Sequence, residues 1–148
     1  MQDYQKRFIN RYAPVALQEW ERGGALPSLT LTQALTESRW GLSHFAAKTN
    51  SLFQTPAGSG WRGASCRFAG KTFRVYDSPE ASVRDRTDAL RLEPEYKNAV
   101  YERDYRNACR FLSRAGYFSS VFAQALINTI EKYRLYQYDS AKASTKRE

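Results

Sequence analysis

Residues 33–41 read QALTESRWG, and they close an apolar run that begins at Leu29 and recurs with helical spacing. Gly41 predicts the end of this helix, because glycine adopts the left-handed conformation that terminates helices at little cost. Glu37 is therefore expected in the last turn of a mostly buried helix, beside the ring of Trp40. Burial and the negative end of the helix both disfavour an ionised carboxylate. We expect a carboxyl group that keeps its proton near neutral pH, as a general acid must; the alternative is a solvated glutamate at a frayed helix end.

Composition limits the class of protein. The chain has 148 residues, of which 42% are hydrophobic, and this favours one folded domain over disorder. The net charge of +8 favours an anionic partner such as nucleic acid, a membrane surface or an acidic wall polymer. No apolar run is long enough to span a bilayer, and the N-terminus does not have the pattern of a signal peptide. Work outside the cytoplasm would then require a leader absent from this sequence or another export route.

The residues that bind metals or form catalytic triads are few. His44 is the single histidine, so we expect no metal site, no cofactor and no Ser-His catalytic pair. Cys66 and Cys109 lie far apart in the sequence and have no metal-ligand spacing. They are either one disulfide or two free thiols, and the sequence leaves both open.

Capping residues and periodicity predict a largely helical chain. Pro14 lies inside the first amphipathic segment and is expected to kink or divide it. The central helix is expected to open at Pro27, with Ser28 or Thr30 as its N-cap. Ser78, Asp104 and either Ser119 or Ser120 are the caps expected for later helices. The predicted helices other than the central one cover residues 3–22, 42–48, 79–92, 94–100, 104–115 and 121–133.

One short hairpin interrupts the helices. Residues 64–68 and 72–76 alternate in polarity around a glycine, which predicts two antiparallel strands. We therefore predict a mainly α (α+β) fold in which a helical lobe and a small β-hairpin lobe form a cleft that Glu37 faces. Residues 1–139 are expected to form a single domain, and residues 140–148 a polar, disordered tail.

Six segments in a fixed order carry a resemblance to a known family. They read FINRYAP at 8–14, LTQALTESRWG at 31–41, SLF at 51–53, GWRG at 60–63, FRVYDS at 73–78 and AGY at 115–117. In these segments the chain resembles the glucosaminidase domain of flagellar-type and autolysin-type peptidoglycan hydrolases, glycoside hydrolase family 73. The resemblance implies a lysozyme-like helical lobe with a hairpin lobe, and cleavage of wall glycan after N-acetylglucosamine. It also implies that Glu37 is the general acid.

The sequence does not decide which group assists Glu37 in catalysis. Many family members carry another carboxylate in the hairpin, but residues 64–68 read ASCRF and hold no acid. One option is that the substrate's own N-acetyl group acts as the nucleophile, with Tyr117 orienting it. The other is that Asp77 or Glu80, just after the hairpin, supplies the carboxylate.

Aromatic residues in the matching segments are candidates for sugar binding, because their rings stack on the apolar faces of sugars. Packing in the core is an equal alternative for Trp40 and Tyr76, whereas the flanking glycines favour an exposed ring at position 61. The expected substrate-binding residues are Trp40, Ser51, Phe53, Trp61 and Tyr76.

Two other functions compete with hydrolysis. The first is a module that binds peptidoglycan strands in a cell-envelope assembly but cuts them weakly or not at all. The second is a basic nucleic-acid binder that stacks bases on its aromatic rings, although no known nucleic-acid motif is found and none is expected as a partner. We expect a monomer that acts on peptidoglycan in the periplasm or outside the cell.

Overall fold

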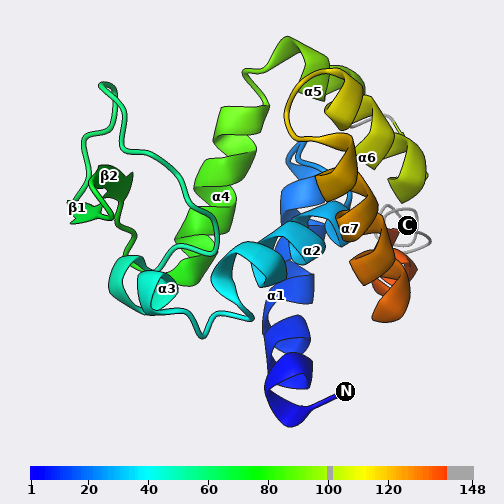
Figure 1. The fold of residues 1–148 in the computed structure, drawn as a ribbon, viewed down its shortest axis with the longest axis horizontal. Coiled ribbons are helices and arrows are strands. Elements are labelled where there is room, and N and C mark those ends of the chain that lie inside the picture. The colour runs from blue at the N-terminus through cyan, green and yellow to red at the C-terminus, as the bar shows by residue number, and fades with distance from the viewer. Residues whose placement is uncertain (100–101, 140–148) are drawn as a thin grey trace.

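A computed structural model describes residues 1–99 and 102–139 of the chain, so the tail expected at 140–148 lies outside the described residues. The main body consists of helices α1 (Asp3–Glu21), α2 (Pro27–Ser38), α6 (Tyr105–Arg114) and α7 (Ser120–Lys132), with the short 3-10 helix η1 (Leu135–Asp139). Helices α4 (Pro79–Leu90) and α5 (Pro94–Ala99) connect this body to the rest of the chain (Figure 1). No described helix is both long and apolar enough to cross a membrane.

Helix α2 is the centre of the fold. It packs against α1, α6, α7 and η1, and nine of its 12 residues are buried. A helix that is covered on nearly every side takes its stability from packing, so the threonines that would weaken it in isolation are tolerated. The same burial fixes the direction in which the last turn, with Glu37, leaves the core.

Helix α1 runs from Asp3 to Glu21 without interruption, so Pro14 does not divide it. Pro14 lies inside the helix but is exposed, as is Asn10, one turn earlier. Proline removes the hydrogen bond to the carbonyl of the residue four positions earlier. At this exposed position water can satisfy the carbonyl of Asn10, and the helix needs no break.

Both predicted ends of α2 need correction. The N-cap is Leu26 rather than Ser28 or Thr30, with Pro27 at the first helical position. The side chain that satisfies this end comes from η1: Asp139 accepts hydrogen bonds from the backbone N–H of Ser28 at 2.8 Å and from its hydroxyl at 2.5 Å.

At the other end, the left-handed turn begins at Arg39 (φ 50°), two residues before the predicted Gly41 (φ 76°). Trp40 between them also has a positive φ of 60°. The hydroxyl of Ser38 accepts a hydrogen bond from the N–H of Gly41 at 2.8 Å, which helps to stabilise this unusual turn. The chain therefore turns sharply away directly after Glu37.

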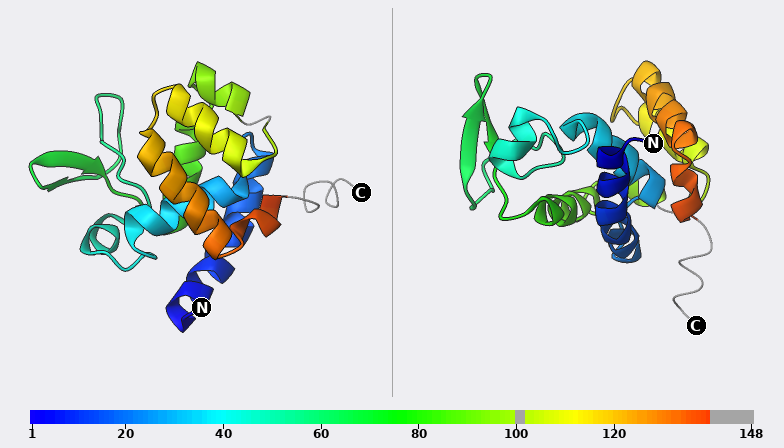
Figure 2. Two further views of the ribbon diagram at one scale, coloured as in Figure 1. Left: turned by 45° about the vertical axis from the view of Figure 1, so that its right-hand side comes forward. Right: turned by 90° about the horizontal axis from the view of Figure 1, so that it is seen from below.

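The predicted hairpin is present and forms a second, smaller lobe. Strands β1 (Ser65–Phe68) and β2 (Lys71–Arg74) pair antiparallel beside the short helix α3 (His44–Thr49). The ring of Phe45 in α3 packs edge-on against Phe68 and Phe73 at 5.2 and 5.0 Å. Two views of the ribbon show the hairpin projecting from the helical body (Figure 2). The predicted α+β class, with a helical lobe and a hairpin lobe, is confirmed.

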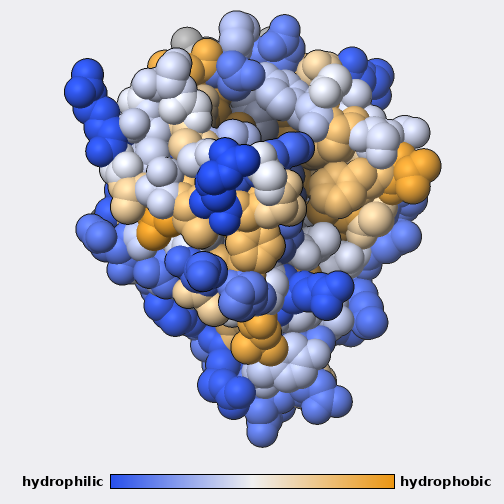
Figure 3. Space-filling view, turned by 60° about the vertical axis from the view of Figure 1, so that its left-hand side comes forward, coloured by the Kyte–Doolittle hydropathy of each residue, from blue (hydrophilic) through white to orange (hydrophobic). Residues whose placement is uncertain are grey.

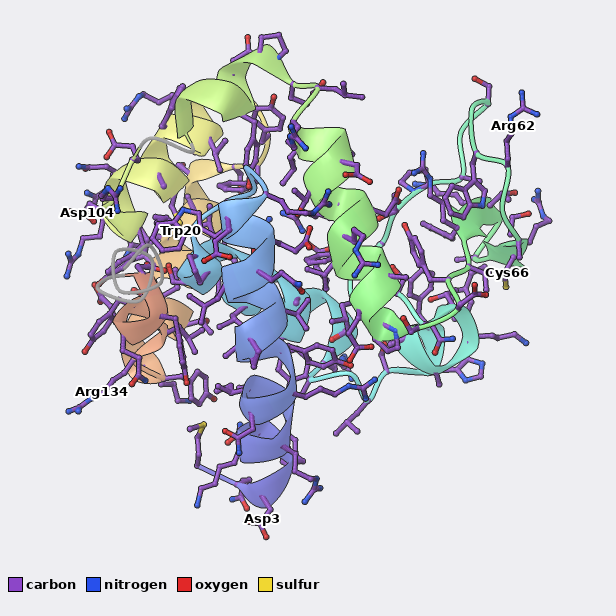
Figure 4. All side chains as sticks on the ribbon, turned by 180° about the vertical axis from the view of Figure 1, so that it is seen from behind. Asp3, Trp20, Arg62, Cys66, Asp104 and Arg134 are labelled. Carbon is purple, nitrogen blue, oxygen red and sulfur yellow. The ribbon has the colours of Figure 1, made fainter. Side chains whose placement is uncertain are left out.

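Both cysteines are free thiols, which resolves the alternative left by the sequence. Cys109 is fully buried, and burial raises the pKa of its thiol to about 12. Cys66 lies at the outer edge of the hairpin (Figure 4) and is partly exposed.

We expect a thiol reagent to label the native protein once, at Cys66, because reaction requires an accessible thiolate. Counting labels by mass before and after unfolding checks this, with Cys66→Ser as the matched variant. Two labels on the native protein would show that the core around Cys109 opens readily.

Candidate active site

Glu37 lies where the helical body meets the segment that leads to the hairpin. Its side chain is half-buried in the last turn of α2. The backbone N–H of Gln54 donates a hydrogen bond to its Oε1 at 3.2 Å. The carboxyl group therefore has a defined partner, yet it is neither fully enclosed nor fully solvated. In a space-filling view, apolar surface gathers around a hollow on the side of the molecule that carries the hairpin (Figure 3).

The loop of residues 50–58 presents Gln54 to Glu37. The hydroxyl of Ser51 contacts the backbone carbonyl of Phe53 and accepts a hydrogen bond from its N–H at 3.2 Å. The hydroxyl of Ser82 on α4 accepts another from the N–H of Leu52 at 3.1 Å. Ser51, predicted to bind substrate, is 1% exposed, so its hydroxyl shapes this loop.

Arg86 of α4 fills the space behind the loop. Its guanidinium carbon lies 4.2 Å from the centre of the Phe53 ring, and its Nη2 donates a hydrogen bond to Oε1 of Gln33. Phe53, predicted to stack on sugar, is 3% exposed and carries the cation on its face. A cation over an aromatic face is an attractive contact.

Tyr117 belongs to the connection between α6 and α7. Its ring meets Tyr96 edge-on at 5.7 Å, and its hydroxyl donates a long hydrogen bond to Oε1 of Glu93 at 3.4 Å. Burial, with the nearby charge of Glu93, raises the pKa of Tyr117, so the phenol keeps its proton near neutral pH. A substrate would have to compete with Glu93 for this proton.

Trp40 lies in a different environment. Its ring makes edge contacts with Tyr4, Phe8 and Tyr133 at 6.2, 5.6 and 5.1 Å. These residues join the start of α1 to the end of α7. Trp40 thus packs partly buried against the core, the alternative that its pattern had left open.

Trp61 folds back onto its own loop instead of standing free. Its indole N–H donates to the carbonyl of Ala64 at 2.7 Å, and the guanidinium of Arg74 lies 4.7 Å from its ring centre. A Cβ at Gly63 would come within 2.5 Å of the ring, so any larger residue there would displace the Trp61 side chain. The loop tip beyond it, marked by Arg62, projects away from the body (Figure 4).

Trp61 and Tyr76 line a pocket of about 350 Å³ between the hairpin and α4. Tyr76 is buried and donates from its hydroxyl to Asp85 at 2.6 Å, and Arg74 donates to the same carboxylate at 2.9 Å. Burial and Asp85 raise the pKa of Tyr76. Asp77 lies exposed at the same pocket.

The two candidate second acids differ in their surroundings. Glu80 pairs with Arg11 of α1 at 2.8 Å, and this hydrogen-bonded contact lowers the pKa of the Glu80 carboxyl. Asp77 is exposed and lines the pocket between the hairpin and α4. The pocket beside Asp77 is lined by Ala81 and Asp85 of α4, whereas Ser82 and Arg86 of the same helix meet the Glu37 loop.

The structure therefore divides the predicted residues. Glu37, Ser51 and Phe53 meet at the 50–58 loop, whereas Trp61, Tyr76 and Asp77 line the hairpin pocket. Three further residues that contact Glu37, the loop beside it or each other were not predicted from the sequence: Gln33, Gln54 and Arg86. Only Gln33 carried a local signal, because it lies one turn before Glu37 on the same helix face. Among the described residues, no group of three or more His, Cys, Asp or Glu side chains could hold a metal ion.

Two curated relatives match 97% and 78% of the chain. It is 29% identical over 162 aligned positions to the exo-glucosaminidase LytG of Bacillus subtilis (strain 168), covering 97% of this chain and 57% of LytG. It is 30% identical over 131 positions to the peptidoglycan hydrolase FlgJ of Vibrio parahaemolyticus, covering 78% of this chain and 42% of FlgJ. The chain thus spans about half the length of these relatives.

The fold is similar to that of a solved glycosidase domain. The glycoside hydrolase domain of FlgJ from Salmonella typhimurium superposes with a TM-score of 0.76 at 23% identity, covering 99% of this chain and 98% of that domain. Residues 13–135 match the glucosaminidase family, described as mannosyl-glycoprotein endo-beta-N-acetylglucosaminidase. Because this match spans most of the chain and includes Glu37, the chain belongs to the glucosaminidase family of glycoside hydrolases.

Proposed function

We propose that this chain is a peptidoglycan hydrolase, an endo-β-N-acetylglucosaminidase that cleaves wall glycan after N-acetylglucosamine with Glu37 as the general acid. One observation carries the proposal: the acid that matches the family's pattern lies half-buried at the end of the central helix and is held by the N–H of Gln54. A positioned carboxyl group can donate a proton to the glycosidic oxygen as the bond to the sugar breaks. The name of FlgJ, a peptidoglycan hydrolase, and that of LytG, a glucosaminidase, support the substrate and the bond proposed.

In this proposal the second catalytic group is the acetamido group of the substrate. Strand β1 carries no acid, Glu80 is paired with Arg11, and Asp85 is paired with Arg74. The acetamido oxygen of the sugar attacks C1 while the C1–O bond to the leaving sugar breaks and Glu37 gives its proton to that oxygen. Water then adds to C1, its proton returns to Glu37, and the ring formed by the acetamido group reopens. Tyr117 orients the acetamido group.

Glycan contact is assigned to two places. At the Glu37 loop, Phe53 and Ser51 shape the surface that meets the sugar at the scissile bond. At the hairpin pocket, the partly exposed ring of Trp61 meets a more distant part of the strand, and the buried Tyr76 supports that ring. The positive charge of +8 attracts the anionic wall, and the site of action is the periplasm or the cell exterior.

Digestion of purified sacculi tests the function. Wild-type protein should release fragments whose reducing ends are N-acetylglucosamine, identified by mass after borohydride reduction. An endo-acting enzyme releases long fragments early, whereas an exo-acting one, as LytG is named, releases only the smallest product from the start. Sacculi that bind the protein without releasing reducing ends would show a binding module, and binding to DNA without binding to sacculi would contradict both readings.

A further inference from the structure

Arg86 touches both segments that hold Glu37. From α4 it donates a hydrogen bond to the side-chain amide of Gln33 on α2. Its guanidinium also lies over the ring of Phe53 in the 50–58 loop, at 4.2 Å. One side chain thus joins α4, α2 and the loop at a single point.

Both residues that Arg86 contacts are close to Glu37 along the chain or through the loop. Gln33 precedes Glu37 by four residues, so the two side chains lie on the same face of α2, one turn apart. Phe53 is followed by Gln54, whose N–H donates to Glu37 Oε1 at 3.2 Å. Moving the loop relative to α2 would therefore change the hydrogen bond that orients the carboxyl group.

Burial makes the arrangement specific for arginine. Gln33 is 6% exposed and Phe53 is 3% exposed, so water does not readily replace the cation at either partner. A planar guanidinium can stack on a ring while it donates from its edge, whereas the ammonium of lysine cannot do both. Tyr96 lies against the same guanidinium, which acts to lower the pKa of its phenol, although burial dominates and raises it.

We infer that Arg86 is a positioning residue for Glu37: it locks Gln33 and Phe53 together, so that the carboxyl group is aligned for proton transfer to the leaving oxygen. This inference rests on the proposed function. Arg86 acts through Glu37 and does not touch the scissile bond. Its loss should therefore affect reactions that need the proton and spare those that do not.

The test compares two substrates in the Arg86→Met variant, which keeps an apolar stem over Phe53 but loses the donor. On soluble glycan strands we expect kcat to fall about 10-fold with KM nearly unchanged, because misplaced catalytic groups slow the chemical step. On a 2,4-dinitrophenyl glycoside of an N-acetylglucosamine oligomer, we expect a fall of less than about 2-fold, because this leaving group departs without a proton. Arg86→Lys should reproduce the loss on glycan.

The matched control is Arg110→Met, which removes an exposed arginine of α6 and should leave both rates unchanged. Equal losses on both substrates, or wild-type rates on both, would overturn the inference. If Arg86→Met melts below the assay temperature, the comparison is made with Arg86→Lys, and the same outcomes decide. If wild-type protein releases no reducing ends from glycan, the proposed function fails, which is distinct from failure of the positioning role.

Discussion

Replacing Glu37 with glutamine is expected to lower kcat on sacculi by about 10³-fold, within the range that a general acid contributes. Glutamine has nearly the same shape, and its side-chain oxygen can still accept the hydrogen bond from the N–H of Gln54. The variant therefore loses the proton and little else. Quantifying reducing ends released per enzyme molecule over time measures the effect, and co-sedimentation with sacculi should show unchanged binding.

Asp77→Asn and Glu80→Gln accompany this variant as tests of the second group. Under catalysis assisted by the substrate's acetamido group, both should stay within about 3-fold of the wild type, because neither carboxylate enters the reaction. A loss in either one that approaches the loss in Glu37→Gln would identify it as the second acid. Equal release of reducing ends by Glu37→Gln and the wild type would exclude Glu37 as the acid.

The second large effect concerns stability: Asp139→Asn is expected to flatten the pH dependence of the free energy of unfolding. Asp139 is 7% exposed, and burial raises its pKa from 3.8 to about 6, despite two hydrogen bonds from Ser28 that act to lower it. The folded protein thus binds this proton more tightly than the unfolded chain. Its stabilising contribution is full below about pH 4 and is lost as pH rises through about 6.

The size of this contribution is about 3 kcal/mol when the shift is converted to free energy. Urea unfolding across about pH 4 to 7 measures it, and the wild type should lose stability over this range while the asparagine variant changes less. Ser28→Ala should act in the opposite direction, because it removes a donor that favours the carboxylate. Parallel curves for the wild type and Asp139→Asn would contradict the prediction.

Short-range signals predicted the elements well. Ser78, Asp104 and Ser119 accept hydrogen bonds from the N–H groups of the first turns of α4, α6 and α7 at 3.1, 2.8 and 3.0 Å. The hairpin followed from alternation around a glycine. These signals act between residues a few positions apart, so they are present in the sequence before any packing is known. The same locality placed Glu37 at the end of a buried helix.

The predictions that were wrong concern residues whose outcome depended on distant parts of the chain. Pro14 was expected to kink or divide α1, and the helix is not divided there, because Pro14 lies on the solvent side. The expected N-cap of α2 was local, whereas the actual partner, Asp139, is 111 residues away. No pattern near residue 28 indicates that partner.

The sequence alone was sufficient to establish the element types and the two-lobed class, because capping and periodicity are local, and its family motifs make Glu37 the proposed acid. Folding decided which side chains meet that acid. Arg86, Gln33 and Phe53 are joined across three separate segments, and Trp40 and Glu80 are drawn to other partners. Such contacts depend on how α2, α4 and the 50–58 loop pack, and packing is a property of the whole chain.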